Sequence, residues 1–249
     1  MVSKDDQLIF VPETDSTNNY LQLLNQTQTL ADETVVWTDF QTSGRGQTGN
    51  SWESEAGKNL MFSIFFYPKR MPANQPFVIA ELAALCVKRT LDKLVPGITV
   101  KWPNDIYWND RKICGILIEN QLAAGLISHS VIGIGVNLNQ DIFHSGATNP
   151  VSLKQITGYS FDRLEVLEQL RSEFHEIREQ LEIDGADIIH REYMQALYRC
   201  DGFYLFSDKD GSFEARIHHV ELSGHLVLER KNGVLSMYAF KEVSYLIDN

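Results

Sequence analysis

Apolar residues recur along the chain with two different periods, which predicts a mixture of strands and helices. Short β-branched or fully apolar runs, typical of buried strands, occupy residues 34–38, 60–66, 98–100 and 113–118. Amphipathic helical spacing appears over residues 75–94, 162–184 and 187–197. From residue 199 onward the helical spacing stops, and short strand-like runs are separated by the turn signals Asp201-Gly202, Asp210-Gly211, Ser223-Gly224 and Asn232-Gly233. The pattern predicts an α+β domain over residues 1–198 and a small β-barrel domain over residues 199–249.

The stretch from Lys101 to Glu119, KWPNDIYWNDRKICGILIE, predicts a hairpin that carries charged groups towards the core. One strand ends near Trp108, the pair Asn109-Asp110 forms the turn, and the second strand begins at Lys112. Regular alternation along that strand places Lys112 on the face of Cys114 and opposite to Gly115.

A lysine that enters so apolar a strand either extends to the surface or meets an anion inside the fold. Both alternatives stay open, because several charged and polar side chains lie close by in the sequence: Lys101, Asn104, Asp105 and Arg111.

A glycine-rich loop, QTSGRGQTGNSW, follows the strand predicted over residues 34–38. Gly44-x-Gly46-x-x-Gly49 matches the dinucleotide-binding fingerprint in spacing, but that site needs a helix directly after the loop. Here Trp52 and another strand follow, which disfavours a nicotinamide-dependent oxidoreductase. A loop of this kind with one Arg can still wrap an anionic ligand through its backbone amides.

Two other stretches are candidates for ligand contact. Asp15 and Ser16 precede an apolar run at the position of a helix cap, where exposed amides and hydroxyls suit a polar ligand. Gly133 and Gly135 share one face of a predicted strand, and Asn137 follows on the same face. A strip without side chains suits a flat ligand, and close packing by the protein itself explains the two glycines equally well.

Composition narrows the class of protein. The net charge of −11 argues against binding to DNA, which calls for a basic face. No apolar run has the length needed to cross a bilayer, and the first residues lack the apolar core of a signal peptide. The three cysteines are scattered, and the histidines lack metal-ligand spacing, so neither a disulfide framework nor a protein-bound metal is predicted. These features together predict a cytoplasmic protein.

The order and spacing of these motifs resemble those of the biotin protein ligases (biotin–acetyl-CoA-carboxylase ligases). The resemblance rests on five segments: Asp15-Ser16-Thr17-Asn18, the loop from Gly44 to Trp52, Lys101-Trp102-Pro103-Asn104-Asp105, Arg111-Lys112 with Gly115-Ile116-Leu117, and Gly133-Ile134-Gly135-Val136-Asn137. It implies a catalytic domain related to class II aminoacyl-tRNA synthetases, followed by a small C-terminal β-barrel. No helix-turn-helix pattern precedes Leu8, so the chain resembles the short form without a DNA-binding domain.

The resemblance also implies a reaction in two steps. Biotin and Mg-ATP form biotinyl-5′-adenylate, and a lysine of a biotin carboxyl carrier domain then attacks it. Catalytic roles are implied for Lys112, Arg45 and Asp105. Contacts with biotin are implied for Ser16, Thr17, Asn18, Gln41, Gly44, Arg45, Lys112, Gly115, Gly133 and Gly135. Contacts with ATP are implied for Gly46, Gln47, Asn50, Trp52, Lys101, Asn104 and Asn137.

Three further expectations complete the prediction. Mg²⁺ enters with ATP, with no metal ligands assigned to the protein, and a homodimer is common in the family. Many members carry Arg where this loop has Gln47, Thr48 and Asn50, so weaker retention of the adenylate is expected here. A lipoate or octanoate ligase of the same architecture, and a biotin-binding module without catalysis, are the alternative functions.

Overall fold

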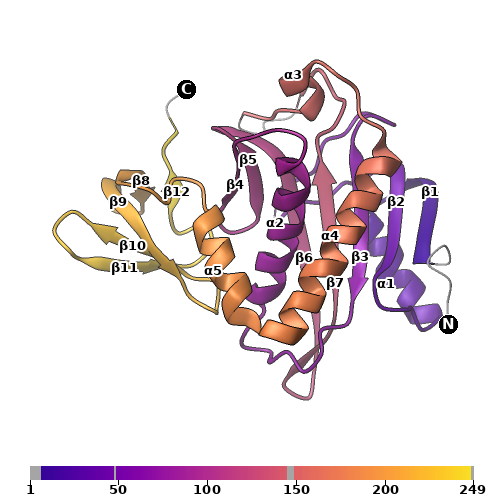
Figure 1. Cartoon of the computed structure of the whole chain (residues 1–249), viewed down its shortest axis with the longest axis horizontal. Helices are drawn as coiled ribbons and strands as arrows, with labels where there is room; N and C mark the ends of the chain where they lie inside the picture. Colours follow the sequence, from indigo (N-terminus) through magenta and orange to yellow (C-terminus); the bar gives the residue numbers. More distant parts are fainter. Residues whose placement is uncertain (1–6, 48, 145–148, 248–249) are drawn as a thin grey trace.

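Two β-sheets organise the chain (Figure 1). The structure is a computed structural model that describes residues 7–47, 49–144 and 149–247. The larger sheet is mixed, because β1 and β2 are parallel while all its other neighbouring strands are antiparallel. Its strands, in spatial order, are β1 (Leu8–Thr14), β2 (Thr34–Gln41), β3 (Leu60–Phe66), β7 (Leu126–Val136), β6 (Arg111–Ala123), β5 (Asp105–Trp108) and β4 (Ile98–Lys101).

Helices cover the two faces of this sheet unequally. One face is covered by α2 (Phe77–Asp92), α4 (Arg163–Asp184) and α5 (Ala186–Ala196), which cross in front of the strands in Figure 1. The opposite face carries α1 (Thr17–Thr27) over β2, β3 and β7. The short α3 (Leu153–Thr157) lies at one end of the sheet.

Alternation along β3 explains how both faces acquire a core. Ile64 and Phe66 belong to the large apolar core beneath α2 and α4, whereas Phe65 belongs to a smaller core beneath α1. Because α1 is short, it does not cover the part of this sheet face that β5 and β6 form, and other segments lie over that part. The candidate site lies on that part of the face. The predicted α+β fold is confirmed.

The smaller sheet is built by the last fifty residues of the described chain. Five antiparallel strands lie in the order β11 (Leu235–Tyr238), β10 (Leu226–Arg230), β9 (Gly211–Val220), β8 (Tyr204–Asp208) and β12 (Ser244–Tyr245). The Nε1 of Trp102 donates to the carbonyl of Gly224 at 2.9 Å and joins this sheet to the edge of the larger one. The closed barrel and the domain boundary after Tyr198 stay predictions.

A buried ion pair joins α2 to α5. Glu81 is fully buried, and one of its oxygens lies 2.6 Å from Nδ1 of His190. Burial raises the pKa of Glu81, while the hydrogen bond that His190 donates to Glu81 raises the pKa of His190, with Asp187 and Glu221 adding to the same effect. A raised folded-state pKa means that the stabilisation is present at low pH and is lost as the pH rises.

We therefore expect the wild-type free energy of unfolding to fall as the pH rises from the ordinary histidine pKa, 6.5, through the raised value in the folded protein. The His190→Gln variant should remove the part of this pH dependence that comes from the imidazole, and the part that comes from the raised pKa of Glu81 should remain. Without the imidazole, a buried carboxylate loses its charged partner, which costs about 1.5–3 kcal/mol at pH 6. Urea unfolding at pH 6 and pH 9 measures both effects, and equal pH slopes for the two proteins would contradict the expectation.

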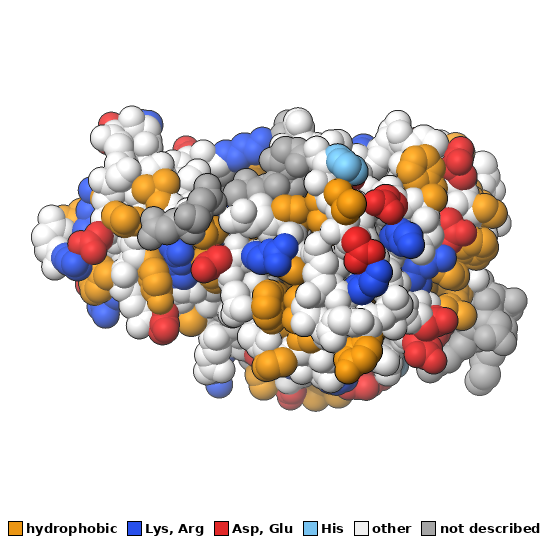
Figure 2. All heavy atoms as spheres, turned by 90° about the horizontal axis from the view of Figure 1, so that it is seen from above, with side chains coloured by type: hydrophobic (Ala, Val, Ile, Leu, Met, Phe, Trp, Pro, Cys, Tyr) orange, Lys and Arg blue, Asp and Glu red, His pale blue; other side chains and the backbone are white. Residues whose placement is uncertain are grey.

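Acidic and basic side chains are interspersed on the face of the molecule drawn in Figure 2, and small clusters of apolar side chains lie between them. No helix among the described residues is long and apolar enough to span a membrane.

Candidate functional site

A cavity of about 850 Å³ opens on the face of the larger sheet that α1 leaves uncovered. Its walls come from the start of α1, the glycine-rich loop after β2, the strands β5, β6 and β7, and the C-terminal segment from Phe240 to Ile247. Every residue predicted for the site lines this cavity except Gly44: Ser16, Thr17, Asn18, Gln41, Arg45, Gly46, Gln47, Asn50, Trp52, Lys101, Asn104, Asp105, Lys112, Gly115, Gly133, Gly135 and Asn137. Thr48 lies outside the described residues.

One end of the cavity is polar and connected by hydrogen bonds. The backbone N–H of Thr17 donates to Oε1 of Gln41 at 2.9 Å, and the Thr17 hydroxyl lies 3.2 Å from the same oxygen. The hydroxyl of the buried Ser63 lies 2.7 Å from that of Thr17 and 2.6 Å from Oδ1 of Asn18.

These hydroxyl contacts outnumber the protons available to them. Two hydroxyls carry one proton each. They face three oxygen–oxygen contacts: Ser63 with Asn18, Ser63 with Thr17, and Thr17 with Gln41. One of these contacts therefore has no proton between its oxygens, and the Thr17 hydroxyl and the Gln41 side-chain oxygen both belong to lining residues that a ligand N–H can meet.

A cation and a carboxylate face each other in the middle of the cavity. Nζ of Lys112 lies 2.6 Å from Oδ1 of Asp105 and 5.9 Å from the centre of the Trp52 ring. Both charged side chains are about three-quarters buried. An ammonium group held in this way can meet an anionic ligand on the floor of the cavity.

The prediction that Lys112 shares a face with Cys114 is wrong. The ladder between β5 and β6 pairs Ile106 with Cys114 but Tyr107 with Lys112, so Ile113 is an extra residue. Such a β-bulge shifts the alternation by one position. As a result, the Lys112 side chain lies on the face of Gly115, within 3.4 Å of where a Cβ at residue 115 would stand.

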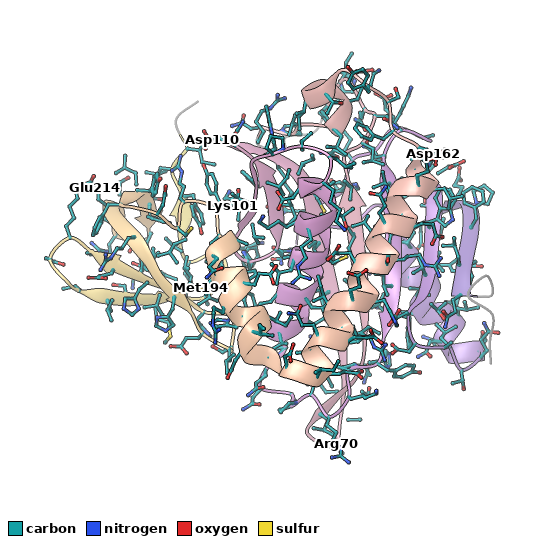
Figure 3. All side chains as sticks on the ribbon, in the orientation of Figure 1. Arg70, Lys101, Asp110, Asp162, Met194 and Glu214 are labelled. Atoms are coloured by element: carbon teal, nitrogen blue, oxygen red, sulfur yellow. The ribbon has the colours of Figure 1, made fainter. Side chains whose placement is uncertain are left out.

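Lys101 and Tyr107 extend the charged region towards the smaller sheet (Figure 3 labels Lys101). Nζ of Lys101 donates to the Tyr107 hydroxyl at 3.0 Å and lies 5.4 Å from the ring centre of Tyr245. Burial lowers the pKa of Lys101, and burial raises the pKa of Tyr107. The lysine therefore shares its surroundings with aromatic rings from both sheets.

The glycine strip is covered by side chains of the protein itself. A Cβ at Gly133 would stand 2.4 Å from Oδ1 of Asn18, and a Cβ at Gly135 would stand 2.5 Å from the indole of Trp52. The same indole lies 2.8 Å from the Cβ position of Gly115. Close approach of Asn18 and Trp52 thus accounts for the three glycines, in line with the packing alternative. Nε1 of Trp52 is buried and has no hydrogen-bond partner among the described residues.

The glycine-rich loop, described over residues 44–47 and 49–52, folds back on itself over the cavity. Arg45 and Ser51 form an isolated antiparallel bridge, and the N–H of Trp52 donates to the carbonyl of Gly44 at 2.9 Å. A Cβ at Gly44 would lie 2.5 Å from the Trp52 carbonyl. This glycine therefore lies where the two ends of the loop approach each other closely, and it does not line the cavity. Nη2 of Arg45 lies 2.7 Å from a carboxylate oxygen of Glu119.

Asn104 and Asn137 both hold backbone groups near the charged centre. The Asn104 side chain donates to the carbonyl of Ile116, and the side-chain amide of Asn137 lies 3.5 Å from the carbonyl of Lys112. Arg111 does not line the cavity, and its guanidinium donates to the carbonyl of Pro150 at 2.9 Å.

Comparison with known proteins identifies the family. The model of the biotin/lipoate A/B protein ligase family matches residues 10–137, just over half of the chain. The chain belongs to this family.

Relatives of this ligase-family chain match well beyond that segment. The bifunctional ligase/repressor BirA of Escherichia coli (strain K12) is 28% identical over 243 residues, which cover 94% of this chain and 72% of that protein. A biotin–[acetyl-CoA-carboxylase] ligase of Paracoccus denitrificans is 32% identical, covering 88% of this chain and 93% of that protein. Among solved structures, a biotin protein ligase from Aquifex aeolicus in complex with biotin and ATP has a TM-score of 0.77 at 24% identity, with 95% and 97% of the two chains covered.

Sequence reasoning missed residues that line this family member's cavity or that bond to the lining residues from behind. Ser63 interrupts the apolar strand LMFSIFF, and a lone hydroxyl in a buried strand was a usable signal. Glu119 ends the apolar run of β6 and was likewise visible as an acid beside the motif. The segment from Phe240 to Ile247 gave no signal, because its place at the cavity depends on how the smaller sheet packs.

Proposed function

We propose that this chain is an ATP-dependent biotin–protein ligase, which makes biotinyl-5′-AMP and transfers biotin to a lysine of a biotin carboxyl carrier protein. Its membership of the biotin/lipoate A/B protein ligase family supports this function. The named relatives are a bifunctional ligase/repressor and a biotin–[acetyl-CoA-carboxylase] ligase, and both match this chain over most of its length. The cavity supplies the polar and cationic groups that such a reaction uses.

The polar end of the cavity is the observation that favours biotin over lipoate or octanoate. Thr17 and Gln41 present hydroxyl and amide groups there, with the buried Ser63 bonded to Thr17 behind them, and polar groups cost free energy when a ligand displaces their water without replacing its hydrogen bonds. The ureido group of biotin offers N–H donors and a carbonyl acceptor to them. A dithiolane ring or an alkyl chain offers neither, so lipoate and octanoate should bind weakly.

The first step joins two anions, the biotin carboxylate and the α-phosphate of ATP. Repulsion between them is overcome by fixed cations, which stabilise the charge that develops as the carboxylate attacks phosphorus and pyrophosphate leaves. We assign this role to Lys112 and Arg45, which line the same cavity from β6 and from the glycine-rich loop. With Ser16, Thr17, Asn18 and Gln41 around the ureido group, the carboxylate of biotin would extend towards Lys112.

The second step needs a neutral amine from the carrier lysine. Asp105 is the carboxylate assigned to orient this amine or to accept its proton, and the Lys112 ammonium now lies 2.6 Å from it. Attack of the amine on the acyl carbon releases AMP, so no covalent bond to the protein is required. Lys112 would then stay close to the phosphate that leaves.

We assign the nucleotide to the other walls of the cavity. The indole of Trp52 supplies an aromatic face and an unpaired Nε1–H donor. The remaining assigned contacts come from Gly46, Gln47, Asn50, Lys101, Asn104 and Asn137. Mg²⁺ would arrive with the triphosphate and keep water ligands, which is its usual behaviour with nucleotides. The described residues hold no cluster of three potential metal ligands.

ATP–pyrophosphate exchange tests this function directly. Purified protein should exchange labelled pyrophosphate into ATP only when biotin is present, and lipoate or octanoate should not replace it. Biotin binding without exchange would point instead to a binding module without catalysis. Exchange with lipoate in place of biotin would reassign the substrate within the family.

Retention of the adenylate is expected to be weak in this chain. Gln47 and Asn50 line the cavity from the loop, and neither adds a positive charge beside the phosphate. The double variant Gln47→Arg with Asn50→Arg should slow adenylate release by roughly tenfold, because a charged hydrogen bond to phosphate is worth more than a neutral one. Filter binding of labelled adenylate after a chase measures the release. The idea fails if the wild type already releases adenylate more slowly than it transfers biotin to carrier.

A further inference from the structure

Two contacts hold the glycine-rich loop against the sheet, and one of them involves a residue that the proposed chemistry does not use. Trp52 rests on Gly115 and Gly135 at one end of the loop. At the other end, Nη2 of Arg45 lies 2.7 Å from Oε2 of Glu119 on β6. The two partners are 37% and 30% exposed, so water reaches this ion pair and it can open and close.

The same oxygen of Glu119 also accepts a hydrogen bond from a buried residue, Asn18. Nδ2 of Asn18 donates to Oε2 of Glu119 at 2.8 Å, and Oδ1 of Asn18 accepts from the Ser63 hydroxyl at 2.6 Å. Asn18 is buried, and it occupies the space that a side chain at Gly133 would need. Glu119 therefore connects the loop to an amide that packing fixes at the polar end of the cavity.

Arg45 can keep this contact while it faces a ligand. A guanidinium carries five N–H donors in a planar fork, and Nη2 is the nitrogen of Arg45 that donates to Glu119. The other donors of Arg45 can meet an anion in the cavity without release of the carboxylate.

We propose that Glu119 is a positioning residue that latches the glycine-rich loop over the polar end of the cavity and slows the release of ligand bound beneath it. The identity of that ligand, biotin or its adenylate, rests on the proposed function. The ion pair between Arg45 and Glu119 that forms the latch is present in the protein without ligand. An ion pair of this exposure changes an equilibrium by about two- to fivefold, so its loss should speed loop opening by that factor.

Two substitutions separate the contacts of Glu119. Glu119→Gln keeps an oxygen for Asn18 and removes the charge that faces Arg45, whereas Glu119→Ala removes both. A matched control is Glu229→Gln, which breaks the Arg216–Glu229 pair, also at 2.7 Å, in the smaller sheet.

Amide hydrogen exchange in the ligand-free protein tests the latch. The amides of Gly46, Asn50 and Trp52 bond within the loop, and their exchange should be about two- to fivefold faster in Glu119→Gln than in the wild type or in Glu229→Gln. Exchange unchanged in Glu119→Gln overturns the proposal, and so does a change seen in Glu119→Ala alone, which would assign the effect to Asn18.

Ligand kinetics then show whether the latch serves the reaction. Glu119→Gln should release biotin and adenylate two- to fivefold faster, while its single-turnover rate of adenylate formation stays within twofold of the wild type. An equal loss in both rates would place Glu119 in the chemistry and contradict a positioning role. If the wild type forms no adenylate at all, the proposed function fails, and the exchange measurement still decides whether Glu119 holds the loop.

Discussion

The Lys112→Ala variant is expected to lose ATP–pyrophosphate exchange by about 10²–10³-fold, the usual cost of removing one preorganised group that stabilises developing charge. Lys112 lies at the centre of the cavity, and its ammonium would bridge the carboxylate and the α-phosphate as they approach. Without it, two anions meet with less positive charge to offset their repulsion, and Asp105 adds a third negative charge nearby. Biotin-dependent exchange under saturating substrates measures the loss.

A matched control separates this effect from damage to the fold. Lys154→Ala removes a lysine that also lies 2.6 Å from a carboxylate, that of Asp141, and is similarly buried, but does not line the cavity. It should leave exchange within twofold of the wild type, and both variants should unfold at nearly the same urea concentration. A Lys112→Ala protein with more than a third of wild-type exchange would show that the cation is dispensable.

The Gly135→Ala variant should lower kcat/KM for biotin-dependent exchange by roughly 10²-fold. Its methyl group would stand 2.5 Å from the indole of Trp52, so the ring has to leave the floor of the cavity. Displacement of a positioned group by about 1 Å can cost this factor in rate. Trp52 emission, isolated as the difference between each protein and its Trp52→Phe form, should shift in parallel.

Gly202→Ala provides the comparison for this substitution. A Cβ there would meet nothing closer than Tyr204 at 3.7 Å, and the site lies outside the cavity. It adds the same methyl group to the chain and should leave both kcat/KM and Trp52 emission unchanged. Normal activity in Gly135→Ala would mean that the ring can move away without cost, and that the glycine has another purpose.

Much of the fold could be predicted from local patterns. The turn at Asn109–Asp110 lies where expected, and Asn109 adopts the left-handed conformation that asparagine tolerates (φ 51°). A strand, β3, follows the glycine-rich loop as predicted. These features depend on residues that are neighbours in the chain, which is why periodicity and turn chemistry are sufficient to find them.

The contacts that shape the site could not be predicted in this way. Asn18 and Glu119 are 101 residues apart, and no local pattern indicates that they share a hydrogen bond. The indole over Gly115 and Gly135 is likewise a matter of tertiary packing, so the strip of glycines looked bare in the sequence. The face of Lys112 was predicted wrongly because a bulge has no reliable signature in a single sequence.

The bulge in β6 affects which insertions and deletions near Lys112 the site can tolerate. The bulge takes up Ile113 as an extra residue, so Lys112 stays opposite Tyr107 on the ligand side of the sheet while the Ile113 side chain is buried in the opposite core. Deleting Ile113 would restore regular alternation and place the lysine next to Cys114, which still directs it towards the cavity. An added residue between Lys112 and Cys114 should therefore be tolerated less well than the loss of Ile113, because without a second bulge it would move the lysine to the core face.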